Sequence, residues 1–225
     1  GFPHGNYTRY YDTRIQGLRE DPRIRRLQSL WLSGKKVLDI GCNDGTFTRA
    51  LHDKFGCRYV LGIDIDAKLV AAAWDALAED AVWRRKGFLK APVAFRREDV
   101  AQDTHPDSGY DAVLCLSVSK WIHLNHGDAG LRQFFEKVHR MLAPGGVFIL
   151  EPQEWKSYRK NRASSSRTQL LYPTLELRPA DFPRILQEEV GFKSVTEIPP
   201  TEPLEDEKGS LAKGFNRPMF ICLKE

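Results

Sequence analysis

The sequence predicts an α/β fold with a mostly parallel central sheet, helices on both faces and an antiparallel C-terminal strand. Apolar runs of strand length alternate with segments whose apolar residues recur at helical spacing, which is typical of parallel strands joined by helices. The first strand also runs directly into a glycine turn that can begin a helix. The last two strands follow one another with no helix between them, which indicates the antiparallel end.

The first predicted element is a helix that begins after Asp21 and stops at Gly34. Aspartate is a good N-cap and proline suits the first helical position, here Pro22. Apolar residues then recur at helical spacing: Ile24, Leu27, Leu30 and Trp31. A helix therefore leads into the sheet.

Two strand–helix units follow directly. Residues 35–41 (KKVLDIG) read as a buried strand that enters a glycine turn, and a helix is expected over 45–54. Residues 58–65 (RYVLGIDI) form a second predicted strand, after which Asp66 can cap a helix. The apolar face of that helix comprises Val70, Ala73, Trp74 and Leu77.

The second half of the chain continues the alternation. A weaker strand is expected over 92–96 and a clear one over 110–116. An amphipathic helix follows, marked by Leu131, Phe134, Phe135, Val138, Met141 and Leu142 and ended by APGG. The remaining elements are a strand at 147–151, a helix at 179–189 and two final strands at 192–198 and 218–224.

Length and composition favour one domain. The 225 residues, 41% of them hydrophobic, are enough for a single well-buried core. We expect one domain over 1–225, with an aromatic arm at 1–20, a basic segment at 156–172 and an acidic loop at 199–213. No apolar run approaches the roughly 18 residues that cross a bilayer, so we expect a soluble protein with no membrane partner. Because the chain begins at Gly1 without a signal-peptide pattern, we expect a domain cut from a longer protein.

Charge and cysteine content narrow the function only slightly. The net charge of +4 and pI near 8.8 are mild and do not decide whether the chain binds nucleic acid. The cysteines lie apart without a CxxC pair, so we expect buried thiols in a reducing compartment rather than a zinc site or a disulfide framework. They are Cys42, Cys57, Cys115 and Cys222.

A cofactor site is predicted where the first two strands end. Gly41 and Gly45 let the backbone approach a ligand closely, and the amides of the following helix can face a negative group. Asp64 ends the second strand, where a carboxylate can accept both hydroxyls of a ribose. A dinucleotide is disfavoured because the turn lacks G-x-G-x-x-G and has Asn43 where a pyrophosphate needs open space.

The order of acidic residues resembles an S-adenosylmethionine-dependent methyltransferase, whose fold is Rossmann-like. Asp39 precedes the glycines, Asp64 ends the second strand, and a further acid lies in EDV at 98–100. This resemblance implies that Asn43 and the turn amides hold the methionyl end, Asp64 the ribose, and Asp99 with Val100 the adenine edge.

The segment SVSKWIHLNHGD at 117–128 predicts the acceptor side. It offers the donors Lys120, His123, Asn125 and His126, and Asp128 is its one carboxylate. A phosphate oxygen is already ionised and needs donors to position it, whereas a sugar hydroxyl needs a base. Donors outnumber bases, so a phosphate is favoured. Trp121 either packs in the core or stacks on a base, and no metal is expected because His123, His126 and Asp128 have no further ligand.

Six stretches together resemble the RNA methylphosphate-capping methyltransferases, which methylate the terminal phosphate at an RNA 5′ end. The resemblance runs almost end to end, and KWIHLN followed by LEPQEW is not a general methyltransferase pattern. The stretches are GNYTRYYDTR (5–14), VLDIGCNDG (37–45), GIDID (62–66), LCLSVSKWIHLNHGD (114–128), PGGVFILEPQEWKSY (144–158) and KGFNRP (213–218).

The resemblance implies two sets of contacts. Those to the cofactor are Tyr7, Arg14, Gly41, Cys42, Asn43, Asp64, Ile65, Asp99, Val100 and Leu116. Those around the RNA 5′ end are Asn6, Tyr7, Lys120, His123, Asn125 and Phe215, and the catalytic candidates among them are Lys120, His123, Asn125 and Tyr7. Arg14 could pair with the methionyl carboxylate, and the aromatic arm would exclude water. Val100 stands where an aromatic residue is expected, so weaker packing on adenine is expected.

The implied function is transfer of methyl from S-adenosylmethionine to the γ-phosphate of a 5′-triphosphorylated small noncoding RNA, which leaves S-adenosylhomocysteine and needs no metal. A nuclear monomer that meets other ribonucleoprotein subunits is also implied. The alternative is a ribonucleoprotein subunit that stays bound to its capped RNA, with turnover incidental. A small-molecule or protein methyltransferase is disfavoured, because cationic and aromatic groups at the acceptor side suit nucleotides.

The basic run at 156–167, which contains Lys156 and Arg159, keeps two interpretations. The resemblance thins there, and the run holds five basic residues and no acid. It is either a solvated loop or an arm that tracks RNA phosphates and becomes ordered on contact.

Overall fold

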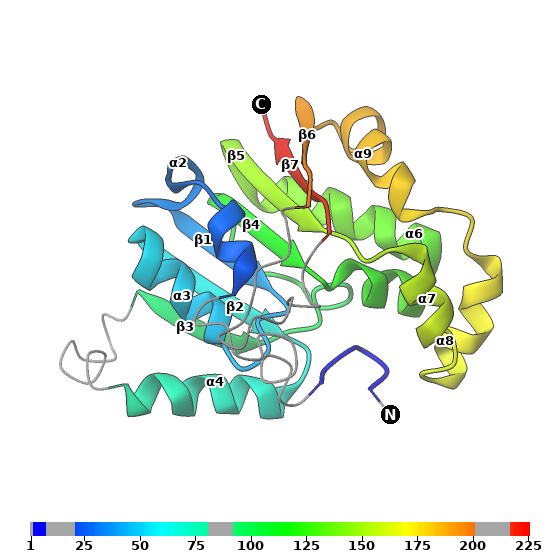
Figure 1. The fold of residues 1–225 in the computed structure, drawn as a ribbon, viewed down its shortest axis with the longest axis horizontal. Helices are drawn as coiled ribbons and strands as arrows, with labels where there is room; N and C mark the ends of the chain where they lie inside the picture. Colours follow the sequence, from blue (N-terminus) through cyan, green and yellow to red (C-terminus); the bar gives the residue numbers. More distant parts are fainter. Residues whose placement is uncertain (1, 8–20, 81–91, 201–216) are drawn as a thin grey trace, which may run out of the picture.

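The structure, a computed structural model, describes residues 2–7, 21–80, 92–200 and 217–225. Within these ranges seven strands form one sheet in the order β3-β2-β1-β4-β5-β7-β6 (Figure 1). The strands are β1 (Lys36–Ile40), β2 (Tyr59–Asp64), β3 (Val93–Arg97), β4 (Tyr110–Leu116), β5 (Leu142–Glu151), β6 (Ser194–Ile198) and β7 (Met219–Leu223). The predicted α/β class is confirmed.

Strand direction brings five carboxyl ends to one edge of the sheet. β1 pairs in parallel with β2 and β4, β2 with β3, and β4 with β5. β7 runs antiparallel to both β5 and β6, which is the predicted antiparallel end. The chain moves outward from β1 to β3 and then returns to β4 beside β1, so a crevice opens between β1 and β4.

Helices cover both faces of the sheet (Figure 1). On one face, α3 (Thr46–Phe55) and α4 (Ala67–Glu79) pack on alternate strand residues such as Val37 and Val60. On the other face, α6 (Ser119–Met141) and α9 (Phe182–Arg184) pack on the intervening residues, such as Leu38. The central strands β1, β2 and β4 are therefore buried on both sides, which explains their nearly continuous apolar sequences.

The predicted N-terminal helix is wrong as a single element. It divides into the 3₁₀ helix η1 (Pro22–Arg26) and the short helix α2 (Ser29–Leu32), with extended backbone at Leu27 and Gln28. Asp21 caps η1 as expected. The Arg26 guanidinium donates to the carbonyls of Arg217 (2.6 Å) and Ile198 (2.8 Å), and these distant contacts override the helical period. Leu30, predicted to face the core, is 69% exposed.

Helix α6 begins twelve residues before its apolar pattern does. It starts at Ser119 and includes the polar segment, with a kink at Gly127, whose φ is 68° and ψ −173°. The predicted helix at 179–189 is confirmed as a helical stretch, but in three irregular pieces: η4 (Pro179–Asp181), α9 and the π-helical η5 (Ile185–Glu189).

The basic run at 156–167 is helical except for a turn at 162–165, so its backbone is not a loop throughout. It lies in α7 (Trp155–Asn161) and extends into α8 (Ser166–Leu171). Tyr158 and Thr168 are fully buried, and they anchor a segment whose basic side chains point outward. A capping box between Ser165 and Thr168 begins α8.

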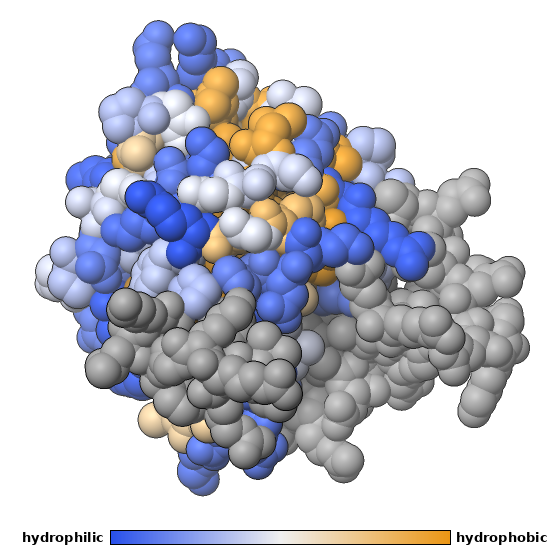
Figure 2. Space-filling view, turned by 90° about the vertical axis from the view of Figure 1, so that its left-hand side faces the viewer, coloured by the Kyte–Doolittle hydropathy of each residue, from blue (hydrophilic) through white to orange (hydrophobic). Residues whose placement is uncertain are grey.

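The remaining observations concern the surface, the cysteines, the search for membrane-spanning helices and the acidic loop. Hydrophilic residues surround a smaller hydrophobic area on the face in Figure 2. All four cysteines are buried and free. None of the helices in the described ranges has the length and apolar character needed to cross a bilayer. Most of the acidic loop at 199–213 lies outside the described residues.

We expect Gly45→Ala to destabilise the fold more than Gly56→Ala. Both glycines have positive φ (76° and 63°), which costs alanine about 1–2 kcal/mol. A Cβ on Gly45 would lie 2.5 Å from the Phe95 ring, whereas one on Gly56 meets nothing within 4 Å. Overpacking therefore adds roughly 1–3 kcal/mol at Gly45 alone. Urea unfolding of both variants measures the difference, and equal losses would contradict the packing argument.

Candidate cofactor and acceptor site

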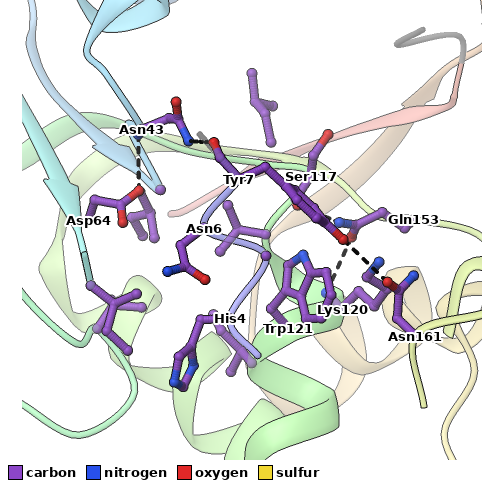
Figure 3. Close-up of a pocket in the computed structure, with 18 of the residues that line it drawn as sticks. His4, Asn6, Tyr7, Asn43, Asp64, Ser117, Lys120, Trp121, Gln153 and Asn161 are labelled. Carbon is purple, nitrogen blue, oxygen red and sulfur yellow. Dashed lines mark hydrogen bonds between the residues drawn. The ribbon is translucent and has the colours of Figure 1, made fainter. Parts of the chain in front are cut away.

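A pocket opens at the carboxyl edge of the sheet, over the crevice between β1 and β4. Its walls come from the ends of β1 to β4, the segments that follow β4 and β5, the arm at residues 4–7, and Arg217 before β7. Figure 3 shows Tyr7 of the arm crossing it, between Asn43 on one side and Asn161 on the other. The predicted edge of the sheet is thus the one that is hollowed.

The turn after β1 is held in a strained, ligand-ready conformation. Gly41, Asn43 and Gly45 all have positive φ. Asn43, with φ of 52°, is the one residue of the three that is not glycine. The amides of Gly41 and Cys42 donate to the Ile63 carbonyl at 2.8 and 3.0 Å. The Asn43 Nδ2 donates to the Tyr7 carbonyl at 3.1 Å, whereas its buried Oδ1 has no partner within the described ranges.

Asp64 is a buried carboxylate that retains acceptor capacity. Its two oxygens accept the amides of Asn43 (3.0 Å) and Asp66 (2.9 Å), and burial raises its pKa. Each carboxylate oxygen has a second lone pair, so the group can also accept two hydroxyls of a ligand. This is the role predicted for the end of β2.

Asp39 lies beneath the glycine turn rather than in the pocket wall. Its Oδ2 accepts the Thr48 hydroxyl at 2.6 Å, and burial raises its pKa to about 6. Arg23, which does line the pocket, forms a buried ion pair with Asp21 at 2.6 Å. Buried charged groups therefore lie beneath the turn that is predicted to hold the methionyl end of the cofactor.

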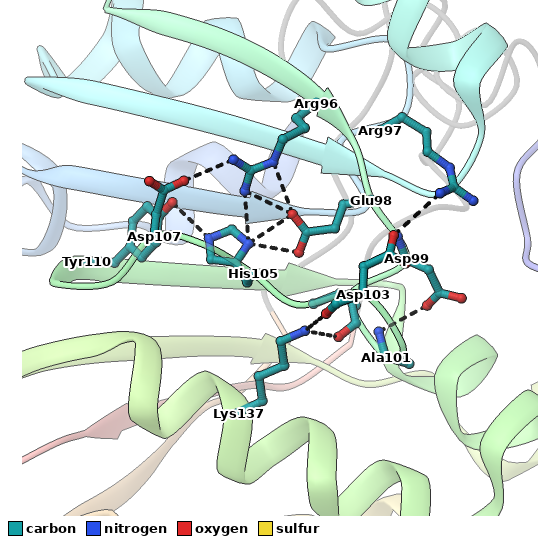
Figure 4. Close-up of polar contacts among 11 residues, drawn as sticks. Arg96, Arg97, Glu98, Asp99, Ala101, Asp103, His105, Asp107, Tyr110 and Lys137 are labelled. Carbon is teal, nitrogen blue, oxygen red and sulfur yellow. Dashed lines mark hydrogen bonds and ion pairs between the residues drawn. The ribbon is translucent and has the colours of Figure 1, made fainter.

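The wall after β3 is fixed by buried polar contacts (Figure 4). Glu98 accepts from Arg96 at 2.9 Å and lies 2.8 Å from His105, whose other ring nitrogen is 3.0 Å from the Tyr110 hydroxyl. Lys137 donates to the Val100 carbonyl at 2.8 Å. These bonds tie the loop that carries Asp99 and Val100 to β4 and α6, so the predicted adenine edge is preorganised.

The N-terminal arm is attached at four points. Asn125 Nδ2 donates to the Pro3 carbonyl (2.9 Å), and Asn6 Nδ2 donates to Asp66 (2.6 Å), which lowers the pKa of that carboxyl. The Tyr7 hydroxyl donates to Asn161 (3.3 Å), and the Tyr7 carbonyl accepts from Asn43. Gly5 packs so closely on Trp121 that a Cβ would lie 1.9 Å from its indole nitrogen.

The acceptor side carries a buried, oriented lysine. Lys120 is 4% exposed, and its Nζ donates to Ser157 at 3.0 Å and lies 4.0 Å from the centre of the Trp121 ring. Its backbone amide donates to Gln153 at 3.3 Å. Trp121 both lines the pocket and packs in an apolar cluster with Leu124 and Tyr158, so its two interpretations are compatible.

Ten of the predicted site residues line the pocket together: Asn6, Tyr7, Gly41, Asn43, Asp64, Ile65, Asp99, Val100, Leu116 and Lys120. Cys42 does not, because its side chain packs against Gly62 in the core, where burial raises its pKa. Lys156 and Arg159 are exposed on α7 outside the lining. Arg14 and Phe215 lie outside the described residues.

His123 and Asn125, two predicted catalytic candidates, do not line the pocket. His123 is fully buried at 2.6 Å from Asp128 and 3.3 Å from the Tyr158 hydroxyl, and burial lowers its pKa. Asn125 bonds the carbonyls of Pro3 and Trp121. Because this segment is helix rather than loop, successive side chains rotate by about 100° and only some face the pocket. His126 does face it.

Several lining residues were not predicted: His4, Arg23, Gln153, Ser157, Asn161 and Arg217. Ser157 and Asn161 reach the pocket because α7 packs beside the first turn of α6 and the N-terminal arm, which no local pattern indicates. Arg217 lies within the quoted stretch KGFNRP, and Gln153 and Ser157 lie within PGGVFILEPQEWKSY, so the resemblance was the available signal for these three residues. Within the described ranges, no three His, Cys, Asp or Glu side chains are grouped to hold a metal.

Comparison with known proteins gives two family matches. The model of Bin3 (Bicoid-interacting protein 3) matches residues 110–224, and a methyltransferase domain model matches 38–150. A probable RNA methyltransferase, At5g51130 of Arabidopsis thaliana, is 37% identical over 99% of this chain and 81% of its own length.

Two further matches concern activity and fold. The 7SK snRNA methylphosphate capping enzyme of Homo sapiens is 31% identical over 99% of this chain, but the match spans only 39% of that protein. A solved S-adenosylmethionine-dependent methyltransferase from Mesorhizobium loti has a TM-score of 0.57 at 23% identity, covering 93% of this chain and 98% of its own, which shows the fold.

The pocket fits S-adenosylmethionine. Asp64 would hold the ribose, the Asp99–Val100 wall the adenine, and the Gly41–Asn43 turn the amino-acid end. The buried Oδ1 atoms of Asn43 and Asn6, which lack partners within the described ranges, are acceptors that a bound ligand's donors can satisfy.

We expect Asp39→Asn to remove a pH dependence of stability. The folded pKa of about 6 exceeds the ordinary 3.8, so the folded state binds more protons between these values and its free energy of unfolding falls as the pH rises. Relative to Asp39→Asn, the wild type should lose up to about 3 kcal/mol from pH 4 to pH 7. Urea unfolding across this range tests it, and parallel curves for the two proteins would contradict the buried-carboxyl argument.

Proposed function

We propose, from the premise that this chain belongs to the Bin3 family, that it transfers methyl from S-adenosylmethionine to the terminal phosphate at an RNA 5′ end. The acceptor is the γ-phosphate of a 5′-triphosphorylated small noncoding RNA. The observation that carries this proposal is the composition of the acceptor wall, where Lys120, Lys160 and Arg217 line the pocket. The acids that line it lie at the far side, where Asp64 ends β2 and Glu98 and Asp99 follow β3.

The chemistry requires alignment more than proton transfer. S-adenosylmethionine supplies an electrophilic methyl group on a sulfonium. A phosphate oxygen is already anionic at neutral pH, so no side chain has to remove a proton, and donors only have to orient the oxygen. A wall that carries Lys120, Lys160 and Arg217 supports a phosphate acceptor, which needs cations to orient it, better than a hydroxyl, which needs a base.

Lys120 is the residue that would orient the phosphate. Its ammonium group is buried, and Ser157 and the Trp121 ring fix its position. A cation held in a low-dielectric wall attracts an anion more strongly than one in water. Because the amide of Lys120 is also bonded to Gln153, both ends of the residue are preorganised.

The N-terminal arm covers the pocket. Tyr7 and Asn6 cross the pocket and bond to residues on both of its sides. A cover of this kind excludes water from the reacting groups, which strengthens the electrostatic contacts beneath it. We infer that the arm must open for the RNA end to enter.

We expect labelled methyl from S-adenosylmethionine to appear on RNA with a 5′-triphosphate and not on the same RNA with a 5′-hydroxyl. Lys120→Met, which keeps the volume and loses the charge, should lower kcat/KM about 10- to 100-fold. Lys193→Met, at an exposed position near the C-terminal end of the chain, is the matched control and should change little. Equal labelling of both RNAs, or label on a ribose or a base, would refute the proposal.

The same assay with a 5′-monophosphate RNA tests which phosphate accepts the methyl group. Faster turnover on the triphosphate supports the γ-phosphate as acceptor, because the additional phosphates would contact the same cations. Faster turnover on the monophosphate would assign the α-phosphate instead.

We also propose that the basic face of α7 contacts RNA beyond its first nucleotide. Four exposed basic residues form this face: Lys156, Arg159, Lys160 and Arg162. Because Lys160 also lines the pocket, the positive charge continues from the acceptor wall onto the surface. Lys156 is paired with Glu154 at 2.6 Å, which lessens its contribution.

Replacing these four residues with glutamine should lower the salt dependence of RNA binding. Each lost phosphate contact removes roughly 0.7 from the slope of log K against log salt for a single strand, so a change of about 2–3 is expected. The control combines Arg58→Gln, Arg140→Gln and Lys193→Gln, which are exposed positions outside the pocket lining. An unchanged slope in the α7 variant would show that the basic face is a solvated surface that does not contact RNA.

A further inference from the structure

A fully buried carboxylate lies behind the acceptor wall. Glu151 ends β5 and is 0% exposed. Its Oε1 accepts the Ser117 hydroxyl at 2.8 Å and also accepts from Nη2 of Arg217, whereas its Oε2 has no partner within the described ranges. A carboxylate taken out of water is costly unless it is paired, so its retention here needs a reason beyond packing.

Arg217 is the partner, and it faces the pocket. Its side chain is 15% exposed and lines the cavity, and its buried Nε has no partner within the described ranges. Its carbonyl accepts from Arg26, which fixes the backbone just before β7. A guanidinium has five donors in a planar fork, so contact through Nη2 leaves donors for a ligand.

The backbone of Ser117 has an unfavourable conformation, which places its side chain in this cluster. It has a left-handed backbone with φ of 66°, which costs a residue other than glycine roughly 1–2 kcal/mol. Its amide donates to the Glu151 carbonyl at 3.0 Å, and its carbonyl accepts from Gln153. The Ser117 hydroxyl consequently bridges Glu151 and Arg217, since it donates to the first and accepts from the second.

The cluster lies over the acceptor half of the sheet. Asp64 and Asp99 mark the nucleoside half, at the ends of β2 and β3. On the other side of β1, Ser117 follows β4, Glu151 ends β5 and Arg217 precedes β7. Lys120 is on this second side too, and Gln153 contacts both it and Ser117. An anion bound here would meet a lysine and an arginine held by one polar network.

We propose that Arg217 is a second cationic ligand of the acceptor phosphate, and that Glu151 positions its guanidinium. This inference rests on the proposed function and adds a residue to its acceptor site. Lys120 is a point charge and Arg217 a fork that can bind two oxygens, so together they can fix the orientation of a terminal phosphate. If Lys120 shares one of the two oxygens that Arg217 binds, the third non-bridging oxygen is left to face the methyl group.

Four variants test the inference: Arg217→Gln, Arg217→Lys, Arg217→Gln combined with Glu151→Gln, and Arg58→Gln. The double variant guards against misfolding, because it does not leave Glu151 charged and unpaired. Arg58→Gln is the control, since Arg58 is exposed and precedes β2 at the opposite edge of the sheet. The measurements are kcat and KM for 5′-triphosphorylated RNA, and calorimetric binding of S-adenosylhomocysteine.

We expect Arg217→Gln and the double variant to lose about 10- to 100-fold in kcat/KM for RNA, and to bind S-adenosylhomocysteine as the wild type does. Arg217→Lys should recover part of the loss, because it restores charge but not the fork. Unchanged kinetics in the double variant would overturn the inference. Weakened S-adenosylhomocysteine binding would also overturn it and would assign Arg217 to the cofactor's carboxylate.

A separate measurement distinguishes failure of this inference from failure of the proposed function. A wild type that methylates no 5′-phosphorylated RNA refutes the function. Binding of a 5′-triphosphorylated dinucleotide in the presence of S-adenosylhomocysteine then still decides the role of Arg217. Weaker binding by the double variant than by Arg58→Gln supports a phosphate contact, and equal binding removes it.

Discussion

A carboxylate removed from water must accept hydrogen bonds, and three such groups at the carboxyl edge of the sheet organise this protein. Asp39 takes the Thr48 hydroxyl beneath the glycine turn, Asp64 takes two amides of the turns around it, and Glu151 takes Ser117 and Arg217. Each pairing fixes a loop that would otherwise be free to move. Buried and hydrogen-bonded charges thus constrain the segments that surround the site.

The same constraint separates the two ends of the pocket electrostatically. Over β2 and β3 the carboxylates accept from backbone amides and keep lone pairs for a ligand, which suits hydroxyls and amines. Over β4 and β5 the carboxylate lies behind the wall and a guanidinium faces the cavity, which suits an anion. The two ends of one cavity therefore offer different environments, one suited to hydroxyls and amines and the other to an anion.

Local signals in the sequence were sufficient for the sheet and for half of the site. Apolar runs predicted the strands, because strands buried on both faces cannot tolerate polar residues. Asp64 was predicted because a parallel sheet brings its carboxyl ends together, whereas Asn43 and Asp99 were predicted from the resemblance to S-adenosylmethionine-dependent methyltransferases. The N-terminal helix was predicted wrongly, since the contacts of Arg26 with Ile198 and Arg217 cross the whole chain and no helical period reports them.

The sequence by itself determined the fold class, the cofactor edge and the excess of donors over bases at the acceptor side, because these depend on residue type and on strand order. Only the tertiary structure decided which donors face the pocket. His123 and Asn125 lie in the same helix as Lys120, yet packing against Asp128 and the arm turns them away, while α7 and the start of β7 bring in Ser157 and Arg217. Side-chain direction follows from how elements pack, and packing joins residues that the chain keeps far apart.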